Sequence, residues 1–488
     1  MKKSLLYVVV VAALGGFLFG FDSGVISGCD KAIQNEFGLS AFWHGFVVSV
    51  ALIGTVIGVF TAGKPSDRWG RKPTLWLMGT LFLVSAVGCA VTPYDAVWGP
   101  ILLGLFRFIG GLAIGGVSVV VPLYIVEVSP GKYRGRLVAM NQFNIVFGIL
   151  ISYVSNYLVA RFLPNVDPKI VWRVMLGMEC LPIFLFMGLL SSIPESPRWL
   201  VRANRLDVAR DVLNRIGYPE IERTLGEIAE SLRAAVGGGD VALFQRRYFK
   251  PILLAFLIAF FNQVSGINAI NYYAPRIFQM IFGEGSELAA LAGTIGVGVV
   301  NLTFTMLAFL FIDKFGRREL IIGGASLVIV MHAIVAWQLS LPQPNAAIAV
   351  SGILGFIAFF AISSGAVIWV YISEVFPNVV RAKGQALGCF THWFMCTVIS
   401  WAFPVVAEKA GTWAFGFFAF MMLVQLLWAI FFMPETKGGT IETSKRAWVS
   451  SDQISDVVRD CGAVSGRVRS SGFSWAGTST RTRMTPPS

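Results

Sequence analysis

The chain has 488 residues, of which 56% are hydrophobic and only 14% are charged. A soluble globular protein has roughly 25% charged residues, so a chain this apolar needs a lipid bilayer around it rather than water. The formal net charge is +12, but the basic residues follow a membrane topology, which argues against a nucleic-acid partner.

Apolar segments of about 20 residues, the length that crosses a hydrocarbon core, follow one another along the chain. Twelve are predicted, at 5–28, 43–62, 74–92, 98–121, 137–160, 171–193, 251–282, 288–311, 320–340, 347–372, 384–406 and 413–433. Lysine and arginine gather in alternate connections, above all in the stretch 194–250. By the positive-inside rule, both termini face the cytoplasm. The chain is predicted to cross a cell membrane, inner or plasma, many times.

Two ionisable residues lie at membrane depth, Asp22 in the first segment and Arg107 in the fourth. Such groups are costly in hydrocarbon and often mark ion pathways. Burial favours a protonated acid, whereas contact with an arginine favours the carboxylate. If alternating access makes and breaks that contact, the proton affinity of Asp22 changes between states. We therefore predict a proton-coupling pair, with a static ion pair between two helices as the alternative.

A charged loop from Gly63 to Lys72 follows the second segment, and two further charged motifs follow it. All three recur in the same order about half a chain later, which indicates a duplicated half and, in so apolar a chain, a transporter. The basic residues can bridge to carboxylates on neighbouring helices and latch the cytoplasmic ends; the alternative is loops that only set topology. The predicted cytoplasmic gate comprises Asp67, Arg68, Arg71, Glu127, Arg134, Glu195, Asp313, Arg317, Arg318, Glu374, Arg381 and Glu435.

The polar stretches divide the chain into four parts. A first bundle at 1–193 is followed by a connector at 194–250, whose composition predicts short amphipathic helices on the cytoplasmic surface. A second bundle occupies 251–435, and the tail at 436–488, rich in Ser, Thr, Gly and Arg, is predicted to be disordered.

The seventh segment is unusually polar, with Asn262, Gln263, Asn268 and Tyr272 among its residues. An amide offers both donors and an acceptor, as recognition of a sugar hydroxyl requires. Hydrogen bonds between helices are the alternative use of such groups in membranes. Trp369, in the tenth segment, offers an apolar face on which a pyranose ring can stack.

Over about residues 8–440 the chain resembles the sugar porter family of the major facilitator superfamily. The motifs that carry the resemblance are Gly63–Lys72, Arg107–Gly111, Pro122–Glu127, Arg134–Arg136, Pro194–Leu200, Gln263–Asn268, Tyr272–Pro275 and Pro434–Gly438. The resemblance implies an all-α membrane protein with twelve transmembrane helices in two pseudo-symmetric six-helix bundles. An acid at the position of Asp22 accompanies proton symport in that family.

The same resemblance implies which side chains contact the sugar. They are Phe19, Gln142, Asn262, Gln263, Asn268, Tyr272, Asn301, Trp369 and His392. Asn262 stands where the family usually has Gln, and His392 where it has Gln or Asn, so both alter which hydroxyls are recognised.

We expect a secondary active transporter that carries a monosaccharide, hexose or pentose, or a polyol together with a proton, works as a monomer and needs no cofactor. A uniporter of the same fold is the nearest alternative, and a non-transporting sugar receptor is a more distant one. An enzyme that depends on a metal is disfavoured, because His44, His332 and His392 fall in separate segments without ligand partners.

Overall fold

The computed structural model describes residues 3–236, 241–283, 285–312, 314–377, 379–410 and 413–437. Across these ranges the chain is helical, without a β-strand. Twelve stretches are long and apolar enough to cross a membrane, which confirms the twelve predicted segments.

The first half contains six spans, each of them a single helix except the sixth. Its helices are α1 (Lys3–Phe37), α2 (Ala41–Thr61), α3 (Gly63–Trp69), α4 (Arg71–Ala90), α5 (Trp98–Val128), α6 (Arg134–Phe162), α7 (Pro168–Gly177) and α8 (Cys180–Leu190). The sixth span runs through α7 and α8 and is interrupted at Met178 and Glu179. The predicted charged loop is the short helix α3, which ends at Gly70 with φ 108°, a backbone conformation that favours glycine.

Helix α1 continues well past residue 28, where the first apolar segment was predicted to end. The polar residues of its last turns lower the hydropathy, but they do not stop the helix, because their side chains find partners on neighbouring helices. Asp30 contacts His44 and Arg276, and Lys31 donates to Gln279.

The second half repeats the plan with two of its spans broken. Its helices are α12 (Phe249–Val264), α13 (Ile267–Phe282), α14 (Glu287–Phe311), α15 (Arg317–Leu339), α16 (Ala346–Ile362), α17 (Ser364–Val375), α18 (Arg381–Ala410) and α19 (Trp413–Phe431). The seventh span breaks at Gly266, with φ 84°, and the tenth at Ser363, with φ −104° and ψ −95°. At both breaks, backbone N–H and C=O groups without a helical partner can form hydrogen bonds with nearby polar side chains or a ligand.

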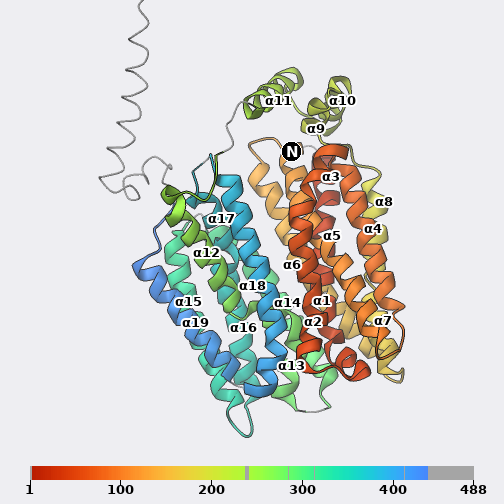
Figure 1. The fold of residues 1–488 in the computed structure, drawn as a ribbon, viewed down its shortest axis with the longest axis vertical. Coiled ribbons are helices and arrows are strands. Elements are labelled where there is room, and N and C mark those ends of the chain that lie inside the picture. The colour runs from red at the N-terminus through yellow and green to blue at the C-terminus, as the bar shows by residue number, and fades with distance from the viewer. Residues whose placement is uncertain are drawn as a thin grey trace, which may run out of the picture. The chain divides into compact units, whose positions relative to one another are not determined.

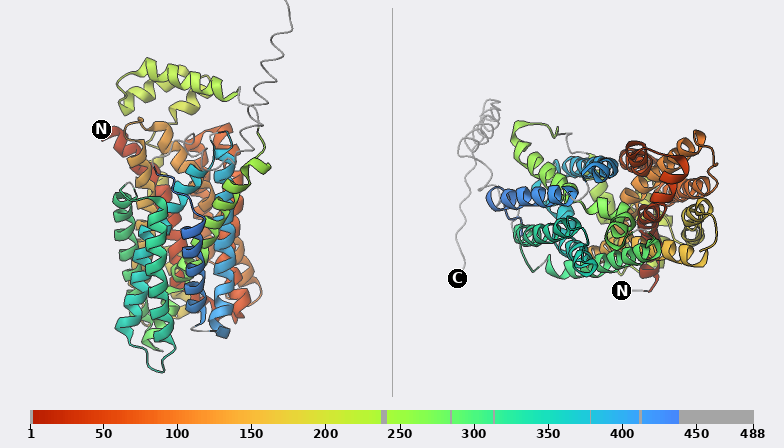
Figure 2. Two further views of the ribbon diagram at one scale, coloured as in Figure 1. Left: turned by 90° about the vertical axis from the view of Figure 1, so that its left-hand side faces the viewer. Right: turned by 90° about the horizontal axis from the view of Figure 1, so that it is seen from below.

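Between the halves lie α9 (Pro197–Arg202), α10 (Leu206–Ile216), α11 (Ile221–Val236) and the 3₁₀ turn η1 (Arg246–Tyr248). Helix α10 buries Ala209, Val212, Leu213 and Ile216 and exposes its charged side chains, as an amphipathic surface helix does. In Figure 1 and in the left view of Figure 2, α9, α10 and α11 lie at one end of the transmembrane helices. Of the tail, all residues from 438 onward lie outside the described part of the chain.

In the described part of the chain, the halves pack most extensively where α2 meets α18, α6 meets α14 and α1 meets α13. Figure 1 shows the first-half helices in red to yellow beside the second-half helices in green to blue. Small residues allow close packing within each half. Gly20 of α1, for example, faces the backbone of Ile145 in α6 so closely that a side chain would collide with it.

Candidate functional site

The polar cluster of the seventh span centres on Gln263, at the end of α12. Its Nε2 donates to Oδ1 of Asn262 at 2.9 Å, and its Oε1 accepts from Nδ2 of Asn268 at 2.5 Å. Asn262 donates in turn to the carbonyl of Ser364 at 3.0 Å. The cluster therefore links the breaks at Gly266 and Ser363, where two interrupted helices meet.

Aromatic rings lie against this cluster. His392 of α18 has its Nδ1 3.0 Å from Nε2 of Gln263, and its ring centroid is 4.8 Å from that of Trp369. Trp393 lies 5.1 Å from His392 and 5.6 Å from Phe19. Phe19 belongs to α1, so this aromatic group draws on both halves of the chain.

The other predicted sugar contacts have different surroundings. Gln142 on α6 and Asn301 on α14 are half-buried, and Asn301 accepts from Thr305 of its own helix at 3.3 Å. Tyr272 is buried on α13 and lies in the electrostatic neighbourhood of Asp22 and Arg107. Tyr272 thus shares a helix with Asn268 and lies near the predicted proton pair.

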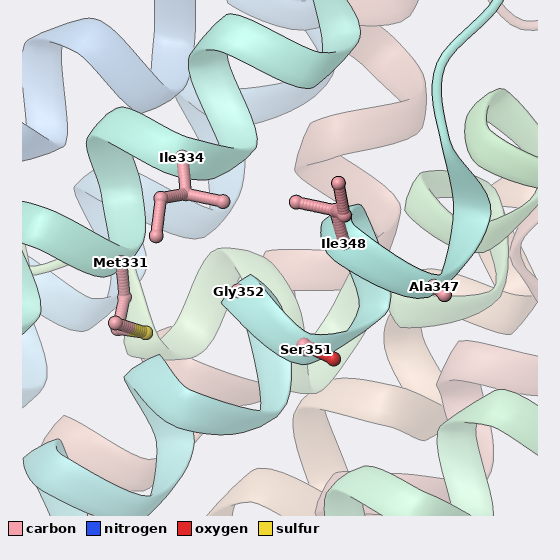
Figure 3. Close-up of a pocket in the computed structure, with 6 residues that line it drawn as sticks. All are labelled: Met331, Ile334, Ala347, Ile348, Ser351 and Gly352. Carbon is pink, nitrogen blue, oxygen red and sulfur yellow. The ribbon is translucent and has the colours of Figure 1, made fainter.

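A hollow elsewhere in the second half does not suit a sugar. Figure 3 shows this pocket between α15 and α16. Its lining consists of Met331, Ile334, Ala347, Ile348, Ser351 and Gly352. One hydroxyl among five apolar residues cannot satisfy a ring of sugar hydroxyls, which need several donors and acceptors.

The predicted pair of ionisable residues is in direct contact. Nη1 of Arg107 donates to Oδ1 of Asp22, and the side chains are 2% and 1% exposed. A third ionisable group, Glu179, lies at the break between α7 and α8, is buried, and interacts electrostatically with both. Sequence reasoning missed Glu179, although the criterion that selected Asp22, an acid at membrane depth, applies to it equally.

The charged motifs form the same bonds in both halves. Arg71 holds Glu127 with two bonds of 2.8 Å, and the backbone N–H groups of Arg71 and Lys72 donate to Glu195 at 3.0 and 3.1 Å. Burial raises the pKa of the Glu195 carboxyl, and these backbone donors oppose that rise.

In the second half, Arg317 holds Glu374 at 3.1 and 2.9 Å, and the N–H groups of Arg317 and Arg318 donate to Glu435 at 2.9 and 3.0 Å. These bonds connect α15 with α17 and with the end of the twelfth span. Each copy therefore ties together helices of its own half.

The remaining members of the predicted gate are more peripheral. Asp67 pairs with Arg71 at 3.2 Å and with Arg202 of the connector at 3.0 Å. Arg68 and Arg134 are exposed, and Arg381 donates to the carbonyl of Phe376 at 3.4 Å. Asp313 lies outside the described residues.

Residues 8–448 match the family described as "Sugar (and other) transporter". The chain is 36% identical to the D-xylose-proton symporter of Escherichia coli K12, over 90% of this chain and 95% of that protein. It is 34% identical to the arabinose-proton symporter of Bacillus subtilis strain 168, over 92% and 96% of the two chains.

Solved structures of the E. coli xylose transporter XylE are similar in fold. The inward-open conformation has a TM-score of 0.80 at 34% identity, over 91% of this chain and 100% of that one. The structure bound to 6-bromo-6-deoxy-D-glucose has a TM-score of 0.73, also at 34% identity, over 92% and 99%. The helices described above are thus arranged more like those of the inward-open relative.

Proposed function

Because the chain belongs to the sugar transporter family of the major facilitator superfamily, we propose that it takes up a monosaccharide together with a proton by alternating access. It is a multi-pass membrane transporter and not an enzyme. Under this proposal the chain lies in a cell membrane with both termini in the cytoplasm, and it functions as a monomer.

The observation that carries the proposal is the position of Tyr272. It belongs to the helix of the amide cluster, yet it lies close to the buried Asp22 and Arg107. Tyr272 therefore places the helix that carries Asn268 near the predicted proton pair. Sugar binding and proton binding can therefore favour the same conformation, as symport requires.

Charge balance explains why this site would hold a proton. Two carboxylates lie near one guanidinium inside the membrane: Asp22 contacts Arg107 directly, and Glu179 lies in the electrostatic neighbourhood of both. With both acids ionised the site has an excess negative charge, which is costly where water cannot reach. One bound proton removes that excess. A movement that separates Asp22 from Arg107 favours protonation, and their return to contact favours release.

Sugar recognition would exchange bonds rather than add them. The amides of Asn262, Gln263 and Asn268 bond to one another, and Gln263 contacts His392. Sugar hydroxyls can replace these partners one for one, because an amide and a hydroxyl can each both donate and accept. Trp369 supplies the flat face for the ring.

The proposal is tested by labelled-sugar counterflow into proteoliposomes, followed by uptake driven by an imposed pH gradient. A symporter performs both. Counterflow without any response to the pH gradient would identify a uniporter. Sugar binding without counterflow would identify a receptor.

We expect His392→Gln to change the preference among sugars that differ at one hydroxyl. An amide offers two donors and an acceptor where neutral imidazole offers one of each. The ratio of dissociation constants for two epimers should change about 3- to 10-fold, the value of one hydrogen bond. Equilibrium binding in detergent measures this ratio, and His332→Gln is the control, since His332 packs among phenylalanines and donates to the Ser265 carbonyl. Equal selectivity in all three proteins would place His392 outside the site.

We propose that the paired motifs serve the cytoplasmic gate by keeping the cytoplasmic end of each half rigid. Arg71→Gln should lower the melting temperature in detergent more than Arg317→Gln does. The Arg71–Glu127 side chains are 7% and 3% exposed, whereas those of Arg317–Glu374 are 11% and 29% exposed, and loss of one partner costs more when the other stays buried. Arg68→Gln is the control, because Arg68 is exposed. Equal melting temperatures for Arg71→Gln and Arg68→Gln would reduce the motif to a topology signal.

A further inference from the structure

Charged residues from both halves meet at the end of the bundle opposite the connector helices. Asp30 of α1 accepts from Nε of Arg276 on α13 at 3.0 Å, and its other oxygen contacts Nε2 of His44 on α2. The side chains of Asp30 and His44 are 4% and 0% exposed, and that of Arg276 is 22% exposed. Under the proposed orientation this is the extracellular end, where Figure 1 shows α13 beside the first half.

We propose that Asp30, His44 and Arg276 form the extracellular gate of this transporter. The Asp30–Arg276 ion pair closes the external entrance in the state described and parts each time the entrance opens. His44 holds Asp30 in place while Arg276 is away. The proposal rests on the proposed function, since it requires a cycle in which the outer ends of the halves separate.

The chemistry of the pair suits a contact that must break and re-form. A buried ion pair is no more stabilising than a well-packed apolar pair, because both ions lose their hydration. When the halves part, however, water hydrates each ion again. An apolar contact between the two halves would instead expose apolar surface to water at every opening.

Arg276 lies on a segment whose backbone can move. Helix α13 begins after Gly266, with φ 84°, and has a non-helical residue at Tyr273, with φ −127° and ψ 18°. Pro275 has no N–H to donate to the Asn271 carbonyl. That carbonyl instead accepts from the hydroxyl of Tyr153, on α6 of the other half, at 3.0 Å. This part of α13 is thus bonded to α6 across the boundary between the two halves.

A second ion pair between the two halves is exposed to solvent rather than buried. Lys31 of α1 lies 3.9 Å from Glu287, and these side chains are 48% and 71% exposed. Solvent screens such a pair, so its contribution is small. The buried pair therefore carries the electrostatic preference for closure, and Lys31 supplies a matched control.

His44 is placed to act in the open state. It belongs to the same half as Asp30, so it stays in contact when α13 withdraws. Its ring is fully buried, 6.2 Å from the ring of Tyr273. Without His44, Asp30 would lose every charged or polar partner shown for its carboxylate as the gate opened, at a high desolvation cost. His44 is accordingly a positioning residue.

Distance measurements between spin labels on the two halves test the gate. Asn35 and Ala289 are exposed near the outer ends of α1 and α14, and Asn35→Cys and Ala289→Cys place one label on each half of a full-length parent whose native cysteines are replaced. The ratio of long to short distances reports open against closed. Asp30→Asn and Arg276→Gln should each raise this ratio about tenfold, and the double variant no further, because either change already breaks the pair.

The control variants distinguish the loss of the Asp30–Arg276 ion pair from a nonspecific effect of substitution at the outer end of the bundle. Lys31→Gln should leave the ratio unchanged, and Arg276→Lys, which keeps the charge, should stay within about threefold of the parent. His44→Phe should lower the ratio, opposite in sign to Arg276→Gln, because it removes the partner that Asp30 keeps in the open state, whereas in the closed state Arg276 still pairs with Asp30. His44→Gln, whose amide can still donate to Asp30, should restore the parent ratio.

Parent-like distances in both Asp30→Asn and Arg276→Gln would overturn the gate, as would equal shifts for Arg276→Gln and Arg276→Lys. Counterflow on the same proteins distinguishes the two proposals. Shifted distances with no sugar counterflow in the parent would leave the gate standing and refute the transport proposal. Counterflow in the parent together with unshifted distances in the variants would support the transport proposal and refute the gate.

Discussion

Asp22→Asn should abolish the accumulation of sugar driven by a pH gradient and leave sugar counterflow substantially intact. Asparagine nearly matches the shape of aspartate and can still accept a hydrogen bond from Arg107, but it cannot bind and release a proton. Uptake should therefore stop at equal concentrations on the two sides, whereas the wild type concentrates the sugar. Proteoliposomes with an imposed pH gradient measure the first quantity, and counterflow without a gradient measures the second.

Asp95→Asn is the matched control, because Asp95 is exposed in the connection between α4 and α5 and bonds only to nearby backbone N–H groups there. It should retain both activities. If Asp22→Asn still concentrates sugar, the proton role of Asp22 is wrong. If the wild type itself ignores the pH gradient, the uniporter alternative replaces the symporter.

Gln263→Ala should weaken sugar binding by about 10- to 100-fold or more, the loss expected when one amide supplies both a donor and an acceptor in a buried site. It would also leave Asn262 and Asn268 without the partner that positions them. Equilibrium binding in detergent gives the dissociation constant. Gln338→Ala is the control, because it removes another buried amide of the second half. Gln338 lies near the end of α15, outside the amide cluster, and accepts from the N–H of Asn345 at 2.8 Å.

Gln338→Ala should lower the melting temperature but keep the sugar affinity of the wild type. Similar losses of affinity in the two variants would mean that Gln263 acts through stability alone. That outcome would move the sugar site away from the break at Gly266.

The properties of the chain that depend on local composition could be predicted from sequence. Hydrocarbon has a set thickness and admits few charges, so twelve apolar segments identify twelve spans whatever their packing. The repeated motifs predicted equivalent contacts, and Arg71 and Arg317 do hold corresponding glutamates. Asp22 and Arg107 were predicted as a pair because an isolated charge at membrane depth needs a partner.

Other features required the tertiary structure. Composition could not say that α1 runs on to Phe37, because its polar last turns are satisfied by helices remote in sequence. Glu179 becomes a neighbour of Asp22 and Arg107 only where the broken sixth span packs against α1 and α4.

The three residues of the proposed gate show the limit most clearly. In sequence, Arg276 is one positive charge on the side with few, and His44 is a histidine without a ligand partner. Asp30, His44 and Arg276 come from three helices and two halves, and folding brings them together at one buried point. Spans and their orientation follow from how each segment partitions between water and lipid, which the segment decides alone. The partners of a buried charge follow from packing between segments, which only the folded chain decides.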